Sequence, residues 1–175
     1  MNQTRVVFDH DIYEQVILAA IASAKQFVWL GTSDLKDLYV GKPGRMVPFL
    51  SVLSDLVNKN VAVRLIHAKE PGEAFRRDFD RYPSLIEGLE RILCPRVHFK
   101  TVVVDGTFAY TGSANLTGAG MGAKSDSRRN FEAGIVTTEA EHVARIMDQF
   151  DAVWMGTYCA ECDRKKYCAD YKDME

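Results

Sequence analysis

The stretch that most constrains this chain is residues 96–115, RVHFKTVVVDGTFAYTGSAN. β-Branched and aromatic residues fill its first half, an Asp-Gly pair forms a typical turn sequence, and a second short apolar run follows. This pattern predicts two strands joined by a tight hairpin. Side chains two apart in a strand share one face, so His98 and Lys100 should point the same way. The hairpin should return Ser113 and Asn115 towards that face, which suits the binding of a phosphate.

The fixed positions of this stretch read His98-x-Lys100-x4-Asp105-x6-Gly112-Ser113-x-Asn115. The sequence resembles the signature of the phospholipase D superfamily at every defined position. The resemblance extends from about Val6 to about Trp154, and it implies an α/β fold, a phospholipase D-like sandwich with a mixed central β-sheet flanked by helices on both faces. The motif occurs once, as in the small nucleases of the superfamily, which build one active site from two subunits.

The rest of the chain alternates strand and helix patterns, which is typical of an α/β sheet covered on two faces. Strands are predicted at residues 5–8, 27–30, 61–66 and 130–136. Helices are predicted at residues 11–26, 46–58, 84–93 and 139–154. A glycine- and proline-containing loop is expected before the second helix.

Length and composition indicate a single catalytic domain. A chain of 175 residues with 47% hydrophobic and 26% charged residues can bury a sizeable core. We expect this domain over residues 1–156 and a cysteine-containing tail over residues 157–175 that packs on it through Cys94. The N-terminus lacks the basic and apolar regions of a signal peptide, and no apolar run approaches the ~20 residues of a membrane span. These features predict a soluble, cytoplasmic protein without a membrane span.

The chemistry of the motif follows from the charge of a phosphodiester. An active site must neutralise that charge and supply both a nucleophile and a proton donor, and histidine can serve in either role. The resemblance implies that two copies of His98, one from each subunit of a homodimer, divide these roles through a phosphohistidine intermediate. It also implies that Lys100 and Asn115 bind the non-bridging oxygens and that Ser113 assists. No cofactor is expected for catalysis, because the sequence offers no clustered acidic and histidine residues spaced for a metal pair.

Two acidic residues are further catalytic candidates. Asp105 belongs to the motif but is out of phase with His98 and Lys100, so we expect it to fix the turn rather than contact the substrate. Glu132 is the candidate for orienting His98 through its second ring nitrogen. Members of the superfamily carry an acidic residue in a similar downstream strand.

Substrate-binding candidates flank the motif. The net charge is −2, so any nucleic-acid binding must depend on a local basic patch. A glycine-rich loop after the motif supplies basic residues, and one histidine follows a buried strand, where α/β folds place ligand sites. The candidates are Gly112, Lys124, Arg128, Arg129 and His67.

The cysteines provide a second signal. Cys159-x2-Cys162-x5-Cys168 is compact, and Cys94 is a distant fourth. In a cytoplasmic chain such a set indicates a metal rather than disulfides, and four thiolates suit either zinc or a [4Fe–4S] cluster. The spacing lacks the two Cys-x2-Cys pairs usual for zinc. One distant cysteine with a terminal triplet is similar to the iron–sulfur site of RecB-like nucleases. We therefore expect a structural metal site and leave both metals open.

Three functions follow from these features. The leading one is a metal-independent nuclease that works as a homodimer, favoured by the small size, the single motif and the basic loop. The second is a phospholipase D-type hydrolase of phosphatidyl headgroups, although the sequence has no amphipathic membrane helix. The third is a non-catalytic nucleic-acid-binding module, which the complete set of His98, Lys100 and Asn115 disfavours.

Overall fold

A seven-stranded mixed sheet is the centre of the computed structural model, which describes residues 3–36 and 38–171. The strand order is β1-β9-β8-β7-β2-β5-β6. The strands are β1 (Thr4–Phe8), β2 (Phe27–Thr32), β5 (Ala62–His67), β6 (Leu89–Leu93), β7 (Thr101–Val104), β8 (Phe108–Gly112) and β9 (Ala133–Thr137). Strands β2, β5 and β6 are parallel, and the other pairings are antiparallel. The predicted mixed sheet is confirmed.

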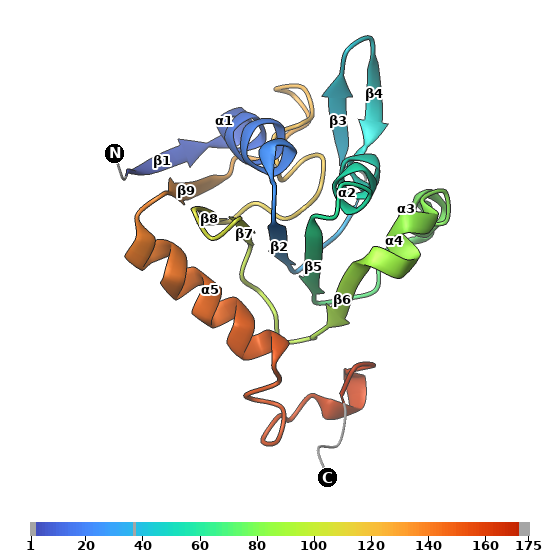
Figure 1. Cartoon of the computed structure of the whole chain (residues 1–175), viewed down its shortest axis with the longest axis vertical. Helices are drawn as coiled ribbons and strands as arrows, with labels where there is room; N and C mark the ends of the chain where they lie inside the picture. Colours follow the sequence, from blue (N-terminus) through green and yellow to red (C-terminus); the bar gives the residue numbers. More distant parts are fainter. Residues whose placement is uncertain (1–2, 37, 172–175) are drawn as a thin grey trace.

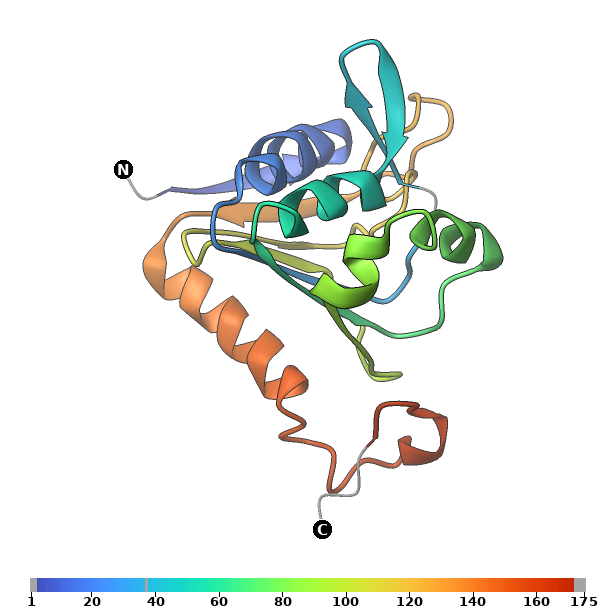
Figure 2. The same cartoon turned by 45° about the vertical axis from the view of Figure 1, so that its right-hand side comes forward.

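Helices cover both faces of this sheet, as predicted (Figures 1 and 2). One face carries α2 (Phe49–Val57), α3 (Glu73–Phe79), α4 (Pro83–Gly88) and a continuous helix over residues 9–23. That helix consists of α1 (Asp9–Ile12), a wider π-helical part η1 (Tyr13–Ala20) and a tighter end η2 (Ile21–Ser23). The opposite face carries α5 (Ala140–Trp154). None of the helices in the described part of the chain has the length and apolarity to cross a bilayer.

Strand β7 supplies the core on both sides of the sheet. All four of its residues are buried. Successive side chains of a strand point to opposite faces. Val102 and Val104 therefore pack in the core cluster that includes buried residues of α1, η1 and α2, whereas Val103 packs with Val143 of α5. The strand next to the predicted site is therefore held rigidly from both faces.

The loop expected before α2 is instead a hairpin. Strands β3 (Tyr39–Lys42) and β4 (Arg45–Pro48) pair antiparallel and are joined by a Pro-Gly turn in which Gly44 has a φ of 76°. Proline followed by a left-handed glycine is the sequence of a type II turn. Because β4 continues to Pro48, α2 begins after that residue and later than predicted.

Further element boundaries were wrong, among them that of the strand predicted over residues 130–136, which begins only at Ala133. The helix predicted over residues 84–93 ends at Gly88, and the remaining residues form β6, which pairs with β5 at the edge of the sheet. Backbone pairing with a strand distant in sequence overrides the local pattern there. The first hairpin strand starts only at Thr101, so His98 and Lys100 lie in the segment that leads into β7.

Candidate active site

The two halves of the motif meet at one edge of the sheet. Strand β7 runs antiparallel to both of its neighbours, β2 and β8, so its start lies beside their ends. Strand β9 also begins at this edge, because Gly112 at the end of β8 pairs with Gly134. His98 and Lys100 precede β7, and Ser113 and Asn115 follow β8. The topology therefore brings these four residues to the same edge.

His98 and Lys100 form a close pair. The Lys100 ammonium Nζ lies 3.3 Å from Nδ1 and 3.5 Å from Nε2 of His98, and it donates a 2.6 Å hydrogen bond to the His98 carbonyl oxygen. Lys100 is 7% exposed, whereas His98 is exposed. Burial lowers the pKa of Lys100, and the Glu132 carboxylate opposes that shift. The pair combines an accessible imidazole with a cation fixed beneath it.

Asn115 is held by the loop that follows β2. Its side-chain oxygen Oδ1 accepts hydrogen bonds from the Ser33 hydroxyl at 2.8 Å, the Thr32 hydroxyl at 3.1 Å, and the backbone N–H groups of Ser33 and Asp34 at 3.2 and 3.1 Å. These donors fix the orientation of the amide, because only the oxygen can accept. The amide NH2 is the group left to donate to a phosphate oxygen. Sequence reasoning missed Thr32, Ser33 and Asp34 as supports, although their place at a strand end was visible.

Two lysines add positive charge near Asn115, one in the same loop and one in the loop after β5. The Asp34 carboxylate pairs with Lys36 at 2.8 Å and with Lys69 at 3.1 Å. Burial acts to raise the pKa of Asp34, but hydrogen bonds from the two ammonium groups outweigh it and lower the pKa. Neither lysine was among the predicted substrate-binding residues, and both stand close to the edge where a phosphate would bind.

Ser113 is linked to Glu132 and to the start of β9. Its hydroxyl donates a short hydrogen bond to the Glu132 carboxylate and accepts one from the Ala133 N–H at 3.1 Å. The other carboxylate oxygen accepts from the Asn130 amide at 3.0 Å. Asp9 fixes the backbone at this point by accepting from the Glu132 N–H at 2.8 Å. Asn130 and Asp9 carried no recognisable sequence signal.

The predicted contact between Glu132 and His98 is not among the hydrogen bonds of residues 3–36 and 38–171. Both oxygens of the Glu132 carboxylate have other partners, Ser113 and Asn130. The carboxylate acts electrostatically on Lys100, whose pKa it raises against the effect of burial. The structure therefore places Glu132 in the site but next to the serine and the lysine.

Asp105 lies at the opposite end of β7, away from His98. Its carboxylate accepts hydrogen bonds from the backbone N–H groups of Lys25, Gln26 and Phe27 at 2.9, 2.7 and 2.9 Å. Burial acts to raise its pKa, but these three donors outweigh burial and hold the pKa below its ordinary value. Asp105 and Gly106 have φ angles of 52° and 64°, as a tight hairpin turn requires. This placement agrees with the expected structural role.

His67 does not line the site. It is 0% exposed, and its Nδ1 lies 2.8 Å from the Lys69 carbonyl oxygen. Burial lowers its pKa, which favours the neutral ring. The prediction that His67 binds substrate is wrong, because a histidine at the end of a strand can turn into the core as readily as outward.

Gly112 belongs to the packing of the site. A Cβ at this position would lie 2.5 Å from the Tyr110 hydroxyl and 2.6 Å from the Ala133 carbonyl oxygen. Its N–H donates to the Lys100 carbonyl oxygen at 3.2 Å. Gly112 thus lets β8 and β9 approach closely and holds the segment that carries Lys100.

The predicted basic loop connects Asn115 with Glu132. Arg129 pairs with Asp126 at 2.7 Å, and its side chain is 20% exposed, whereas Arg128 is exposed and bonds Ser125. Lys124 lies half-buried in the same loop. The loop packs on α1 through the Gly122 carbonyl oxygen, 2.8 Å from Nδ1 of His10. Of the predicted basic residues, Arg128 is the most accessible to a substrate.

The cysteines lie at the other side of the segment that leads into His98. All four are half-buried, and none forms a disulfide. Cys94, Cys159 and Cys162 line one cavity, and Cys168 joins Cys94 and Cys159 in a neighbouring one. Within residues 3–36 and 38–171, no group of three or more His, Cys, Asp or Glu side chains is arranged as a ready-made metal site.

Comparison with solved structures gives several matches to this fold. Nuc from Salmonella typhimurium, a phospholipase D family member, is 16% identical with a TM-score of 0.66, covering 88% of this chain and 95% of that one. NucT from Helicobacter pylori is 14% identical with a TM-score of 0.60, covering 85% and 94%. Phosphatidylserine synthase from Haemophilus influenzae is 14% identical with a TM-score of 0.61, covering 87% of this chain and 39% of that one.

A further structural match is the archaeal chromatin protein TrmBL2, which is described as having a novel mode of DNA binding. It is 13% identical with a TM-score of 0.60, covering 87% of this chain and 52% of that one. A search of curated proteins found no match. The family model described as "Cardiolipin synthase, PLD-like domain" matches residues 17–154. This match spans most of the chain and includes the whole motif, so the protein belongs to the phospholipase D superfamily of phosphodiesterases, within its PLD-like domain family.

Proposed function

We propose that this protein is a nuclease that cleaves nucleic-acid phosphodiesters as a homodimer, with one His98 from each subunit. The observation that carries the proposal is the exposed His98 imidazole against the buried Lys100 ammonium, with Nζ and Nδ1 3.3 Å apart. An accessible nucleophile beside a fixed cation is what attack on a phosphate anion requires. Each chain has one such pair, so two subunits supply the nucleophile and the acid.

In the first step a ring nitrogen of His98 attacks phosphorus, and the bond from phosphorus to the leaving oxygen breaks. The partner's His98, protonated, gives its proton to that oxygen. In the second step water attacks the phosphohistidine and transfers a proton to the partner's His98. The phosphorus–nitrogen bond then breaks and releases the phosphate product, so both histidines return to their starting states.

Lys100 and Asn115 stabilise the charge on phosphorus. The Lys100 ammonium and the Asn115 NH2 donate to non-bridging oxygens, which carry more charge in the transition state. Both donors are oriented before substrate arrives, Asn115 by its four hydrogen bonds and Lys100 by its bond to the His98 carbonyl oxygen. Ser113 is held at the same edge of the sheet by the hydrogen bond that its hydroxyl donates to the Glu132 carboxylate.

Three features support nucleic acid as the substrate. The chain spans 95% of Nuc and 94% of NucT, so it has the size of the small superfamily members that its single motif resembles. TrmBL2, whose fold matches, is described as binding DNA. The site is also flanked by Arg128 in the loop after Asn115, by Lys36 in the loop after β2 and by Lys69 in the loop after β5. Cations in such places bind a phosphate backbone.

A phosphatidyl headgroup is the second candidate substrate. Phosphatidylserine synthase shares the fold, and two large apolar side chains stand exposed next to the site, Phe131 at 92% and Phe8 at 56%. They adjoin Glu132 and Asp9, which are linked by a hydrogen bond from the Asp9 N–H to the Glu132 carbonyl oxygen and by one from the Glu132 N–H to the Asp9 carboxylate. Exposed aromatic groups there suit either acyl chains or stacked bases.

A substrate screen distinguishes these candidates. We expect the purified protein, with EDTA present, to cleave single-stranded DNA or RNA and to leave phosphatidylcholine vesicles intact. His98→Ala serves as the inactive control on each substrate. Headgroup release without nucleic-acid cleavage would replace the nuclease with a phospholipase. Nucleic-acid binding without cleavage, equal in wild type and His98→Ala, would favour a binding module.

The dimer has its own test. Sedimentation at assay concentration should give twice the mass of the chain, and specific activity should fall on dilution as subunits separate. A monomer whose specific activity stays constant on dilution would overturn the composite site while leaving phosphodiesterase activity in place.

The lowered pKa of Lys100 predicts a loss of activity at alkaline pH. Burial lowers its pKa from the ordinary value of 10.5, and the ammonium is charged only below its pKa, so activity that depends on it falls as pH rises through that pKa. Bis(4-nitrophenyl) phosphate is the suitable substrate, because its leaving group needs little help from an acid. As pH rises, we expect kcat/KM to begin to decline before pH 10.5 is reached. In Lys100→Arg the side chain stays charged to higher pH, so the decline in kcat/KM should shift to higher pH. If the decline occurred at the same pH in this variant, it would have to be assigned to another group.

A further inference from the structure

Residues 155–171 come after α5 in the chain and do not form a hydrophobic core of their own. This segment consists of turns and one short helical turn, η3 (Lys165–Tyr167), and it lies near the end of β6 (Figures 1 and 2). None of residues 155–171 is buried. Three of its large side chains are mostly exposed, namely Met155 at 66%, Tyr158 at 58% and Tyr167 at 65%. Hydrophobic burial therefore contributes little to holding this segment in place.

The side chains that turn inward are largely cysteines. Six residues of this segment are half-buried, namely Gly156, Cys159, Cys162, Lys165, Cys168 and Tyr171. All three cysteines of the segment are among them. The segment therefore folds all three of its thiols towards the domain.

Polar contacts from the segment converge on the turn around the fourth cysteine. Arg164 donates to the Pro95 carbonyl oxygen at 3.0 Å, the Cys168 thiol donates to the Leu93 carbonyl oxygen at 3.3 Å, and Asp170 accepts from the Leu93 N–H at 2.5 Å. Leu93 and Pro95 are the two neighbours of Cys94. These contacts bring the distant cysteine to the compact triplet, although it lies in a different part of the fold.

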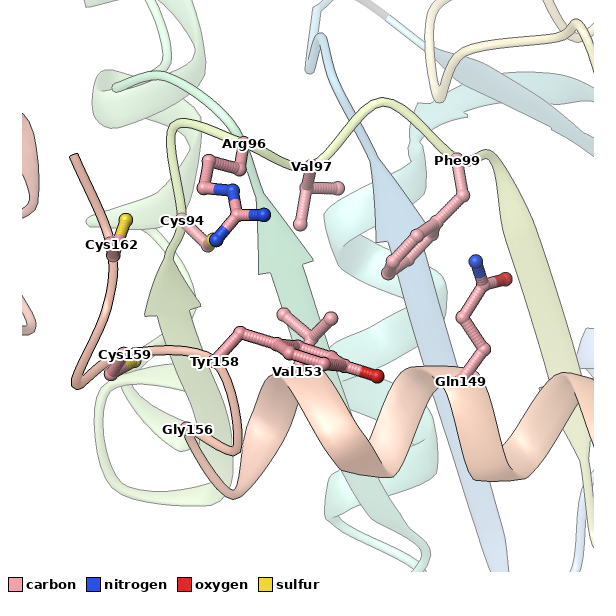
Figure 3. A pocket seen from close by; sticks show the side chains of 10 residues that line it. All are labelled: Cys94, Arg96, Val97, Phe99, Gln149, Val153, Gly156, Tyr158, Cys159 and Cys162. Atoms are coloured by element: carbon pink, nitrogen blue, oxygen red, sulfur yellow. The ribbon is translucent and has the colours of Figure 1, made fainter. Parts of the chain in front are cut away.

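Two adjoining cavities share Cys94 and Cys159 among their lining residues. One, about 250 Å³, also contains Cys162, and the other, about 400 Å³, also contains Cys168. Figure 3 shows the Arg96 side chain beside Cys94 and Cys162, across the cavity from Tyr158 and Val153. A guanidinium next to several thiols suits a site that accumulates negative charge when the thiols ionise.

We propose that the four cysteines bind one thiolate-ligated metal centre, either a zinc ion or a [4Fe–4S] cluster, that fastens residues 155–171 to the domain. Four thiolates are a complete ligand set for each of these centres. The thiols surround adjacent cavities and do not yet meet at one point. Rotation of the cysteine side chains and small movements of a segment without a core bring them together on binding, so metal affinity and the ordering of the segment are coupled.

The position of the centre connects it to the catalytic edge. Cys94 stands four residues before His98, and Val97 between them packs against Phe150 of α5. A metal bound to Cys94 would tie the start of this short segment to residues 155–171. The segment that carries His98 is then fixed at both ends, by the metal site on one side and by β7 on the other.

The experiment measures metal content and protection of the segment, neither of which depends on phosphodiesterase activity. Protein purified without oxygen is assayed for zinc, iron and acid-labile sulfide, before and after treatment with EDTA. We expect about one zinc per chain, or about four irons with four sulfides and a brown absorption band. Trypsin, which cleaves after Arg164, Lys165 and Lys166, should cut the metal-bound protein slowly and the metal-depleted protein at least ~10-fold faster.

Cys159→Ser and Cys162→Ser should each lose the metal and the protection from trypsin. Thr157→Ser, a similarly small change in the same segment, should keep both. If a cysteine variant fails to fold, removing the metal from wild type by a chelator and restoring it gives the same comparison. Metal below about a tenth per chain after reconstitution with zinc and with iron and sulfide would overturn the proposal. Disulfides among these cysteines in the purified protein, or full metal content in Cys159→Ser, would overturn it equally.

Discussion

His98→Ala is expected to lower kcat for phosphodiester cleavage by about 10⁴-fold or more, because the substitution removes both the nucleophile and the proton donor of the composite site. The loss should appear in kcat rather than in KM, since Lys100 and Asn115 still bind the phosphate oxygens. His98 is exposed, so its replacement opens no cavity and should leave the thermal unfolding temperature almost unchanged. The measurement is steady-state cleavage of a nucleic acid by wild type and variant.

His142→Ala is the matched control. His142 is an exposed histidine on α5 whose Nδ1 lies 3.1 Å from the Thr4 hydroxyl, at the end of the sheet opposite the site. We expect its activity to equal that of wild type. Activity of His98→Ala within ~10-fold of wild type would contradict the assignment of His98, provided that both proteins unfold at the same temperature.

Mixing experiments extend the His98 prediction to the dimer. If wild-type and His98→Ala subunits exchange freely at equal amounts, only about a quarter of the dimers carry both histidines. A composite site then predicts a total activity of about a quarter of that of an all-wild-type sample at the same total chain concentration. If each subunit had its own independent site, the mixture would have about half the activity of the all-wild-type sample. The same mixing experiment therefore distinguishes the two arrangements.

The residues that meet at the candidate site were predictable because their positions depend on local rules. Alternation along an extended segment places His98 and Lys100 on one side, and a tight turn returns Ser113 and Asn115 to the same edge. The Asp-Gly pair fixes that turn by local conformational preference. These relations span about twenty residues and need no knowledge of the rest of the fold.

What surrounds those residues was not predictable from the sequence, because it depends on long-range contacts. Asn115 is oriented by Thr32 and Ser33, which lie more than eighty residues earlier. The partners of Glu132 depend on where β9 begins, and no local pattern indicates that Glu132 contacts Ser113 rather than His98. In the same way, residues 89–93 pair with β5 and form a strand where helical periodicity predicted a helix.

His67 shows that the sequence can also suggest a site residue that the fold buries in the core. The rule that strand ends hold ligand sites applies to the edge of the sheet but does not decide which side chains turn outward. Thr32, which pairs with His67 in the register of β2 and β5, is buried yet supports the site through Asn115. His67 is buried in the neighbouring strand, and its Nδ1 lies 2.8 Å from the Lys69 carbonyl oxygen rather than from a motif residue. The packing around each strand end, which the sequence does not reveal, decides between these outcomes.

Asp105→Ala is expected to cost about 3 kcal/mol of the free energy of unfolding, the largest stability effect predicted for an exchange outside the hydrophobic core. The carboxylate accepts from three backbone N–H groups at the start of β2, and alanine leaves all three without this acceptor. Alanine also tolerates the φ of 52° at this position less well than aspartate. Asp105→Asn keeps one acceptor oxygen and the tolerance of that φ, so we expect a smaller loss of about 1–2 kcal/mol. Urea unfolding at neutral pH measures both.

The pH dependence separates this role from a general effect of substitution. The pKa of Asp105 in the folded protein lies below its ordinary value of 3.8, so its ionised form stabilises the fold above that pH and the contribution is lost as pH falls through the folded pKa. The difference between wild type and Asp105→Asn should therefore be constant near neutrality and shrink in acid. Asp126→Ala, which removes a carboxylate that is 90% exposed, should change stability by less than about 0.5 kcal/mol at every pH. If Asp105→Ala proved as stable as Asp126→Ala but lost cleavage activity, Asp105 would have a catalytic role and its assignment to the turn would be wrong.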